Sequence, residues 1–512
     1  MPSSHAPSIL VMLYFEPEVR SAMLERQFDK RLYASKTVEQ VPTLSTELGF
    51  LFHHMESISH NAMSFPGDGV NPHIGVFTPI NFLTAFAAMP EAINLALLDD
   101  NPAVAVKARR PEAFYRFLLH HLDKEAGSKK NPKKPLDSLH GINFISSNEF
   151  VSGSGKPTIS SSRALTLDLS YSPFINSKEQ TKFRFGEVLR HSLCRETRLR
   201  AWNNTSQSYE TVVQRRVATS LPDILSISCA CAGRKAEEGL SVWRTSFDDY
   251  SLWLPETVEV ELEEDGNITV REQIDAGDSQ KKWVTFEGQS SMPSNTTDLL
   301  TKDRGSKKTK VRYRLESVLS FVRDDSDAAA ERGGEAEGHH VLHMRVPPEY
   351  RKRSLTKQRE HAEQLSKLLQ KAGGKGNHKL TLTSKTSQSV IKSRIERVKD
   401  NLKEKQNQSD WVLFNGFVVS PTSVEDARAF HVDFKEPCLV VYRTIGENSK
   451  SASKYVEQQY KDAANVMNSK SISTGKPSKY AVKNSSGRLS WYSFPLICIL
   501  LGANFFFCRA TG

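Results

Sequence analysis

Apolar residues recur at helical spacing through the first quarter of the chain. The segment 8–28, SILVMLYFEPEVRSAMLERQF, starts apolar and continues at that spacing, so that Leu10, Leu13 and Tyr14 share one face of a predicted helix. The same spacing predicts helices in 46–57, with Leu48, Phe52 and Met55 on one face, in 78–101 and in 111–125, and the turn-rich loop 64–75 interrupts the series. A helical subdomain is therefore expected over about residues 1–125.

From about Leu136 onward, the pattern changes to the alternation that is typical of strands. Leu165, Leu167 and Leu169 alternate with polar residues in SRALTLDLSYSP. Further strands are predicted in 220–231, 256–274, 307–322, 339–346, 411–420 and 438–443. Helices followed by strands indicate an α+β domain with a mainly antiparallel sheet, which occupies about 136–447.

Two polar inserts interrupt the predicted sheet. The first, about 323–338, is charged and rich in glycine, and the second, about 350–410, is predicted to be mostly helical. In the second insert a narrow apolar stripe is formed by Ile391, Ile395, Val398 and Leu402. It favours a small satellite helix packed on its neighbour, with a partner-binding or short coiled-coil helix as the alternative.

The chain beyond the predicted domain, which spans 1–447, consists of a polar linker and an apolar tail. The linker covers 448–488 and the tail 489–512. Between Phe494 and Cys508 the tail is apolar but contains Pro495, Gly502 and Asn504, and a membrane helix needs about 20 apolar residues. We interpret the tail as the product of a truncated gene model or a retained intron, with a membrane anchor or a buried strand as alternatives.

Composition indicates a globular protein, and its positive charge favours contact with anionic partners such as RNA. The 512 residues are 38% hydrophobic and carry a net charge of +10. The positive charge is concentrated in three loops, 126–135, 303–314 and 349–360, which lack the interleaved aromatics that base stacking needs. We therefore expect solvated loops, and direct RNA binding that is weak or absent.

The cysteines predict neither disulfides nor a zinc site. Six cysteines in a chain of this length form no disulfide framework, and an acidic pair, Glu16 and Glu18, follows the first apolar run in place of a signal peptide's cleavage site. A cytoplasmic location follows as an expectation. Cys229 and Cys231 have the wrong spacing for zinc, and Cys194 has no second pair nearby. No metal and no cofactor are expected.

Several segments together resemble a known family. They are 190–228, which contains HSLCRETRLRAW and VQRRVATSLPDILSIS, and 8–20, 48–56, 81–92, 313–322, 339–346 and 410–443, the last with LFNGFVVSPTSVEDA. They resemble the ubiquitin-specific-protease fold, and in particular the pseudo-peptidase domain in the catalytic subunits of poly(A)-binding-protein-dependent poly(A) nucleases, the PAN deadenylases. The resemblance covers most of 8–443 and implies a papain-like α+β fold.

The resemblance also implies where a thiol protease would carry its catalytic groups. The cysteine nucleophile, which needs a histidine base, an orienting group and oxyanion donors, would stand just before the first helix, where this chain has Ala6. The base would fall on His339 and the orienting residue on Asn415, next to Gly416. We therefore expect no catalytic site, with Ala6, His339 and Asn415 as vestigial positions or, for the histidines, ordinary strand residues. Because His343 would lie about 13 Å from His339 along a strand, the two are not expected to share a metal ion.

In such deadenylases the hydrolytic activity implied by the resemblance belongs to a separate exonuclease domain with two metal ions. No Asp-X-Glu strand follows Arg443, so this chain is expected to lack the nuclease, and to start after the β-propeller of longer relatives.

The resemblance predicts a non-catalytic scaffold in the cytoplasm and in P-bodies, acting in poly(A)-tail shortening and mRNA decay. Its implied partners are a pseudokinase-like subunit and, indirectly, poly(A)-binding protein and poly(A) mRNA, with no ubiquitin binding. An active ubiquitin-specific protease is the alternative, and a membrane-anchored adaptor is a third hypothesis that depends on the tail.

Overall fold

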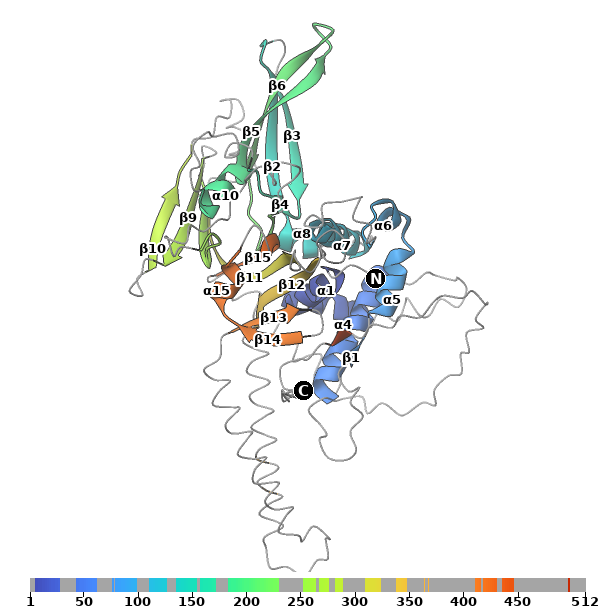
Figure 1. Cartoon of the computed structure of the whole chain (residues 1–512). Helices are drawn as coiled ribbons and strands as arrows, with labels where there is room; N and C mark the ends of the chain where they lie inside the picture. The colour runs from blue at the N-terminus through green and yellow to red at the C-terminus, as the bar shows by residue number, and fades with distance from the viewer. Residues whose placement is uncertain are drawn as a thin grey trace, which may run out of the picture.

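The computed structural model contains a helical part packed on a large sheet, with a second, smaller sheet that projects from the body (Figure 1). It describes residues 5–27, 43–61, 76–77, 79–98, 110–126, 135–153, 157–171, 183–229, 252–263, 267–275, 281–288, 309–323, 338–347, 363, 367, 410–415, 418–430, 435–445 and 496–497. The linker lies outside these residues, as do nearly all of the expected inserts and of the tail.

The first predicted helix is two helices. Helix α1 (His5–Phe15) ends before Glu16, and α2 (Pro17–Gln27) begins with Pro17. Proline lacks the N–H that an unbroken helix would need and its ring clashes with the preceding turn, whereas the first position of a new helix tolerates it. The prediction of one continuous helix over 8–28 was therefore wrong at Pro17.

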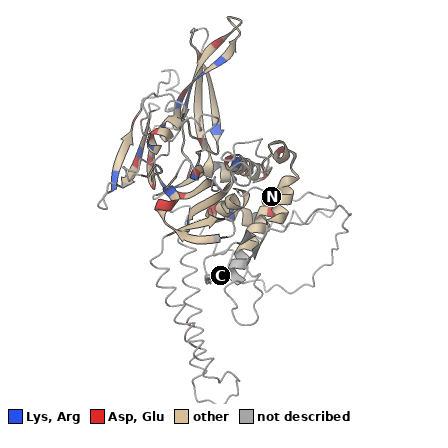
Figure 2. Cartoon of the chain, viewed as in Figure 1, with Lys and Arg blue, Asp and Glu red and all other residues tan. Residues whose placement is uncertain are grey.

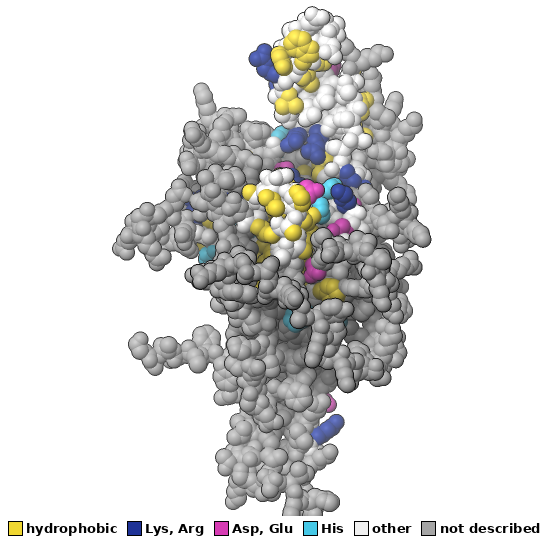
Figure 3. All heavy atoms as spheres, turned by 90° about the vertical axis from the view of Figure 1, so that its right-hand side faces the viewer, with side chains coloured by type: hydrophobic (Ala, Val, Ile, Leu, Met, Phe, Trp, Pro, Cys, Tyr) yellow, Lys and Arg dark blue, Asp and Glu magenta, His cyan; other side chains and the backbone are white. Residues whose placement is uncertain are grey.

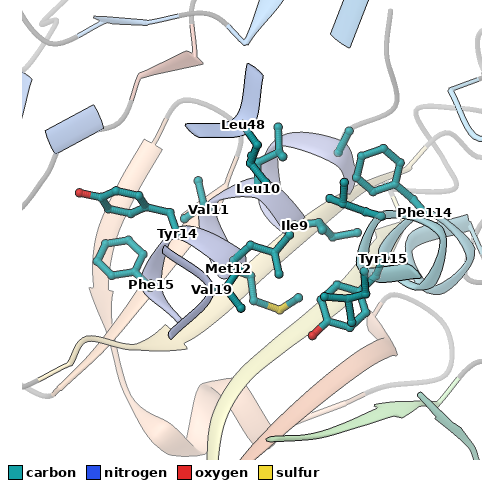
Figure 4. Close-up of a cluster of buried hydrophobic side chains, with 14 of the residues drawn as sticks. Ile9, Leu10, Val11, Met12, Tyr14, Phe15, Val19, Leu48, Phe114 and Tyr115 are labelled. Atoms are coloured by element: carbon teal, nitrogen blue, oxygen red, sulfur yellow. The ribbon is translucent and has the colours of Figure 1, made fainter. Parts of the chain in front are cut away.

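Helix α1 is the centre of the helical part. It is apolar on every side, as is typical of a helix surrounded by other elements, and the side chains of Ile9, Leu13 and Tyr14 have no exposed surface. Around it lie α4 (Leu44–Asn61), α5 (Ile80–Ala87), α6 (Pro90–Asn94), α7 (Arg110–Ala126) and α8 (Pro135–His140), so the helical subdomain is present. The helix predicted over 78–101 is two helices, since α6 starts anew at Pro90, and α8 lies beyond the predicted limit near residue 125. Figure 4 shows Ile9 and Met12 between the aromatic side chains of Phe15 and Tyr115.

A ten-stranded sheet forms the rest of the body. Its main path runs β10 (Lys281–Phe286), β9 (Ile268–Asp275), β8 (Thr257–Leu262), β11 (Thr309–Arg323), β12 (Gly338–Arg345), β13 (Trp411–Asn415) and β14 (Val418–Thr422). On the other edge of β11 lie β15 (Lys435–Thr444), β7 (Ile224–Ser228) and β4 (Leu167–Asp168). Only the pair β4–β7 is parallel among the pairings of this sheet, so the mainly antiparallel sheet is confirmed.

Two hydrophobic clusters lie on opposite faces of this sheet. Alternate residues of a strand point to opposite faces, and in β11 Leu319 packs with α1 while the neighbouring Val318 packs with α10 (Phe185–Leu193). A short helix, α15 (Val424–Arg428), belongs to the second side and starts with a capping box between Ser423 and Asp426. Burial on both faces explains why apolar residues stand next to each other in this half of β11, as Val318 and Leu319 do.

The remaining strands form a four-stranded antiparallel sheet, here called the finger sheet. Its order is β3 (Thr158–Ala164), β2 (Ile142–Phe150), β6 (Ser208–Ala218) and β5 (Cys194–Asn203). The long β5–β6 hairpin reaches farthest from the body (Figure 1). The sequence did not predict β2, β5, β6 or β10, and the predicted strand over Leu165–Leu169 is only the short β4.

The finger sheet is anchored to the body through the N-terminus of α10. The Gly186 N–H donates a 2.7 Å hydrogen bond to the buried carboxylate of Glu272 in β9, and Arg184 lies 3.2 Å from the same carboxylate. A Cβ at position 186 would come within 2.7 Å of the Phe286 ring, so glycine permits this close approach. Because β5 follows α10 directly, this contact fixes where the hairpin starts.

One short strand comes from the tail. Strand β16 (Leu496–Ile497) pairs antiparallel with β1 (Val76–Phe77). Within the described ranges, none of the helices combines the length and the apolarity that a bilayer crossing requires.

Candidate functional site: a peptidase position without a nucleophile

Ala6 stands in the first turn of α1, where the resemblance places the nucleophile. Its side chain has no exposed surface and belongs to the hydrophobic cluster around α1. A methyl group has neither a lone pair nor an ionisable proton, so this position supports no attack on a carbonyl carbon. The place of the expected chemistry is therefore part of the hydrophobic core.

His5, which precedes Ala6 in the chain, packs among aromatic rings. His5 lies edge to face with Phe114 at 5.4 Å and with His340 of β12 at 5.5 Å between ring centroids, and His340 lies 5.2 Å from Phe321. Burial, followed by the nearby His340, lowers the pKa of His5 to about 3. His5 is therefore a neutral imidazole at physiological pH and packs as a ring.

The structure does not bring His339 and Asn415 to Ala6. On β12, Leu342 and Met344 pack in the cluster of α1, so the even-numbered His340 points to α1 and His339 points to the other face. Asn415 pairs with Val341 across β12 and β13, which directs its exposed side chain to the face of His339. The vestigial roles of Ala6, His339 and Asn415 remain predictions, and the histidine that faces the first turn of α1 is His340.

A third histidine, His343, is buried on the face of the sheet that carries α15. Burial and the charge of Lys435 lower its pKa to about 3, although Asp426 opposes them. Burial also lowers the pKa of Lys435 to about 8, and the Lys435 ammonium donates a hydrogen bond to the Asp426 carbonyl. His343 therefore belongs to the packing beneath α15 and not to the region around Ala6.

No cysteine in the described ranges replaces the missing nucleophile. Cys438 is buried in β15 and Cys229 is buried just after the end of β7, and the Cys229 N–H donates to the Cys438 carbonyl at 2.9 Å. Burial raises the pKa of both thiols, which disfavours the reactive thiolate. Cys194 is partly buried at the start of β5, and Cys231 lies outside the described residues.

Metal-ligating side chains do not gather in the described ranges. They contain no group of three or more His, Cys, Asp or Glu side chains that could hold an ion. In particular, His339 and His343 belong to no such group, and structural zinc sites in proteins use four ligands. The described surroundings of Ala6 consist of a hydrophobic cluster and the edge-to-face rings of His5 and its partners.

The sequence analysis missed a buried polar seam between the helices and the sheet. Tyr115 of α7 shares a 3.0 Å hydrogen bond with Ser226 of β7, and the imidazole of His140 lies 3.4 Å from Glu16. Buried acids and histidines are rarely found without a polar partner. An acid such as Glu16 directly after an apolar helix could therefore have indicated a buried polar network. The seam ties α1, α7, α8 and β7 together.

A charged contact continues this connection at α2. Arg443 of β15 donates to both carboxylate oxygens of Glu18, at 2.7 and 2.8 Å. The helical part is therefore attached to the sheet by directional contacts as well as by the hydrophobic cluster.

Relatives of the chain are deadenylase subunits. The human PAN2-PAN3 deadenylation complex catalytic subunit PAN2 is 22% identical over 474 residues, which cover 88% of this chain and 34% of that protein. The chicken PAN2 is 26% identical over 263 residues, covering 48% of this chain and 20% of that protein. At its longest match the chain therefore spans about a third of these curated relatives.

Solved structures of the same kind are also similar. The Saccharomyces cerevisiae PAN2 pseudoubiquitin-hydrolase has 16% identity and a TM-score of 0.45, with 85% of this chain and 81% of that chain covered. The Neurospora crassa Pan2 catalytic unit has 16% identity and a TM-score of 0.48, with 87% and 56% covered.

The match to a protein-family model shows which family the chain belongs to. The model of the ubiquitin carboxyl-terminal hydrolase family matches residues 1–364, which is well over half of the chain. The match includes α1 with Ala6, the finger sheet and most of the large sheet. The chain therefore belongs to the ubiquitin carboxyl-terminal hydrolase family.

Proposed function

We propose that the chain is a non-catalytic scaffold domain of a poly(A) deadenylase subunit and acts in poly(A)-tail shortening. The observation that carries the proposal is the wholly buried Ala6 in the first turn of α1. A peptidase fold whose nucleophile position has become core retains an architecture without the chemistry. The relatives named as catalytic subunits of the PAN2-PAN3 complex supply the deadenylase context.

The first experiment tests the loss of peptidase chemistry. The purified chain is incubated with a fluorogenic ubiquitin reporter at several concentrations, with an active ubiquitin-specific protease as a positive control. We expect no release above the rate without enzyme, and no effect of a thiol-alkylating reagent. Thiol-dependent turnover would contradict the scaffold function and support an active deubiquitinase.

The second experiment tests the deadenylase context. We propose that the chain, in the cytoplasm and in P-bodies, works with a pseudokinase-like partner subunit and, through it, with poly(A)-binding protein on poly(A) mRNA. Affinity-tagged chain expressed in cells should enrich the partner subunit of the PAN2-PAN3 complex above a tagged unrelated domain, in a washed and nuclease-treated extract. Enrichment equal to the control would remove the support for this assembly.

A further inference from the structure

The finger sheet has one face on which arginine and aromatic side chains gather. Alternation and strand pairing place Arg198, Arg200 and Trp202 of β5 on the same face as Tyr209 and Arg215 of β6. The pairing continues through β2 to Arg163 of β3. We call this set of six residues the arginine face. Figure 3 shows hydrophobic and basic side chains close together toward the tip of this projection.

The two aromatic rings are open to solvent. Trp202 and Tyr209 pair directly across the hairpin, 5.3 Å apart between ring centroids and at 74°. They remain 50% and 64% exposed. Large aromatic side chains are usually covered in a monomer, and an exposed pair at the tip of a sheet is a surface that a ligand can cover.

The arginines differ in how far their charge is neutralised. Arg215 lies between two carboxylates, at 3.0 Å from Glu149 and 3.1 Å from Glu196. Arg198 and Arg200 are exposed at alternate positions of β5, about 6.8 Å apart along the strand. On this face Arg198 and Arg200 thus bring two positive charges along β5 toward the aromatic pair, while Figure 2 shows that the same projection also carries acidic residues.

We propose that the arginine face binds single-stranded RNA, with bases stacked on Trp202 and Tyr209 and phosphates held by Arg198 and Arg200. Single strands are recognised by this combination, because every base has a flat face to stack and every nucleotide carries a charge. An apolar protein partner would favour a broad hydrophobic surface, whereas the cross-strand pair next to the rings on this face is Arg200 and Thr211.

The proposal revises the expectation of weak or absent RNA binding. That expectation considered three basic loops, in which charge occurs without the aromatic pattern. The finger sheet combines positive charge with aromatic rings. Strands β5 and β6 pair Trp202 with Tyr209, and Arg200 lies on the same face, two residues before Trp202 in β5. The choice of oligoadenylate as a probe rests on the proposed deadenylase function, but the stacking itself is not specific to adenine.

The experiment measures fluorescence anisotropy of a labelled 20-nucleotide oligoadenylate with the full chain, from low to moderate salt. We expect Trp202→Ala and Tyr209→Ala each to weaken binding about tenfold. The pair Arg198→Gln and Arg200→Gln should reduce the salt slope by about 1.4, since each phosphate contact on a single strand contributes about 0.7.

Leu199 provides the matched control. It lies between the two arginines in sequence but on the opposite face, and it is 46% exposed. Leu199→Ala should leave affinity and salt slope unchanged, and thermal melting should show that all variants are folded.

Three results would overturn the inference. They are the absence of oligoadenylate binding at low salt, unchanged affinity in the variants of the arginine face, or loss of partner-subunit binding without loss of RNA binding. The first two leave the scaffold function intact, because that function is tested by ubiquitin-reporter hydrolysis and partner enrichment. The third would identify the face as a protein interface.

Discussion

The surroundings of α1 and the finger sheet use similar side chains in opposite ways. Around α1, aromatic rings and histidines such as His5 and His340 are buried and pack against each other. On the finger sheet, Trp202 and Tyr209 are exposed beside arginines. The comparison shows that one chain can bury imidazole and aromatic rings around the start of one helix and expose aromatic rings beside arginines on a separate sheet.

The strongest test of this comparison removes one leucine from each region. Leu13 of α1 has no exposed surface, so Leu13→Ala should lower the free energy of unfolding by about 2–5 kcal/mol through lost burial and a cavity. Leu199→Ala on the exposed finger sheet should change it by less than about 0.5 kcal/mol. Urea unfolding followed by circular dichroism measures both, and equal losses would show that the finger sheet is covered in solution.

A second substitution tests the anchor between the regions. Gly186→Ala should destabilise the chain by about 1–3 kcal/mol, because the added methyl group meets the Phe286 ring and the Glu272 carboxylate. The measurement is again urea unfolding, with Gly153→Ala as a comparison. At Gly153 nothing lies within 4 Å of the added methyl group, and its cost comes from a backbone φ of +68° instead. An unchanged midpoint for Gly186→Ala would contradict the described packing of α10.

The dependence of stability on pH tests the buried histidines of the body. The pKa of His343 is about 3, below its ordinary value near 6.5, so the unfolded chain takes up the proton first as the pH falls. The contribution of neutral His343 to the free energy of unfolding is complete above pH 6.5, and it should fall by about 1 kcal/mol between pH 6.5 and 5.5. The variant His343→Leu should show a correspondingly flatter pH profile in chemical unfolding, and a parallel profile would refute the neutral buried state.

The smallest expected effect concerns peptidase activity. Ala6→Cys introduces a thiol at position 6, but cleavage of the ubiquitin reporter should stay at the background rate measured without protein. The new side chain would be buried, and His339 and Asn415 lie on the other face of the sheet. A burst of reporter release from Ala6→Cys, absent from Ala6→Ser, would show that the catalytic geometry has survived.

Much of the body could be predicted from the sequence because its patterns come from burial. The apolar run of α1 and the alternation in β11 predict elements that pack on a core. The finger sheet could not be predicted in this way, because β3 and much of β5 are exposed and CRETRLRAWN shows no apolar period.

The residues of the candidate site could be named from the sequence, but not which of them lie together, because strand register decides that. The resemblance placed Ala6 just before the helix that the apolar pattern predicts from residue 8, whereas the structure has it inside the first turn of α1. The choice between His339 and His340, however, depends on strand register, since a shift of one residue reverses the face of every side chain. The sequence itself does not tell which of these two neighbouring histidines faces α1. The long-range seam of Tyr115, His140 and Ser226 was equally invisible, because it joins segments that are far apart in sequence.

The position of β15 has a consequence for synthesis of the chain. Residues 435–444 form a strand between β7 and β11, which are made much earlier. Until the ribosome has released this segment, both earlier strands have an unpaired edge, and Glu18 lacks its Arg443 contact. Such exposed edges favour aggregation during slow assembly. The domain is therefore expected to complete its folding only after nearly all of its residues have left the ribosome, and to depend on chaperones until then.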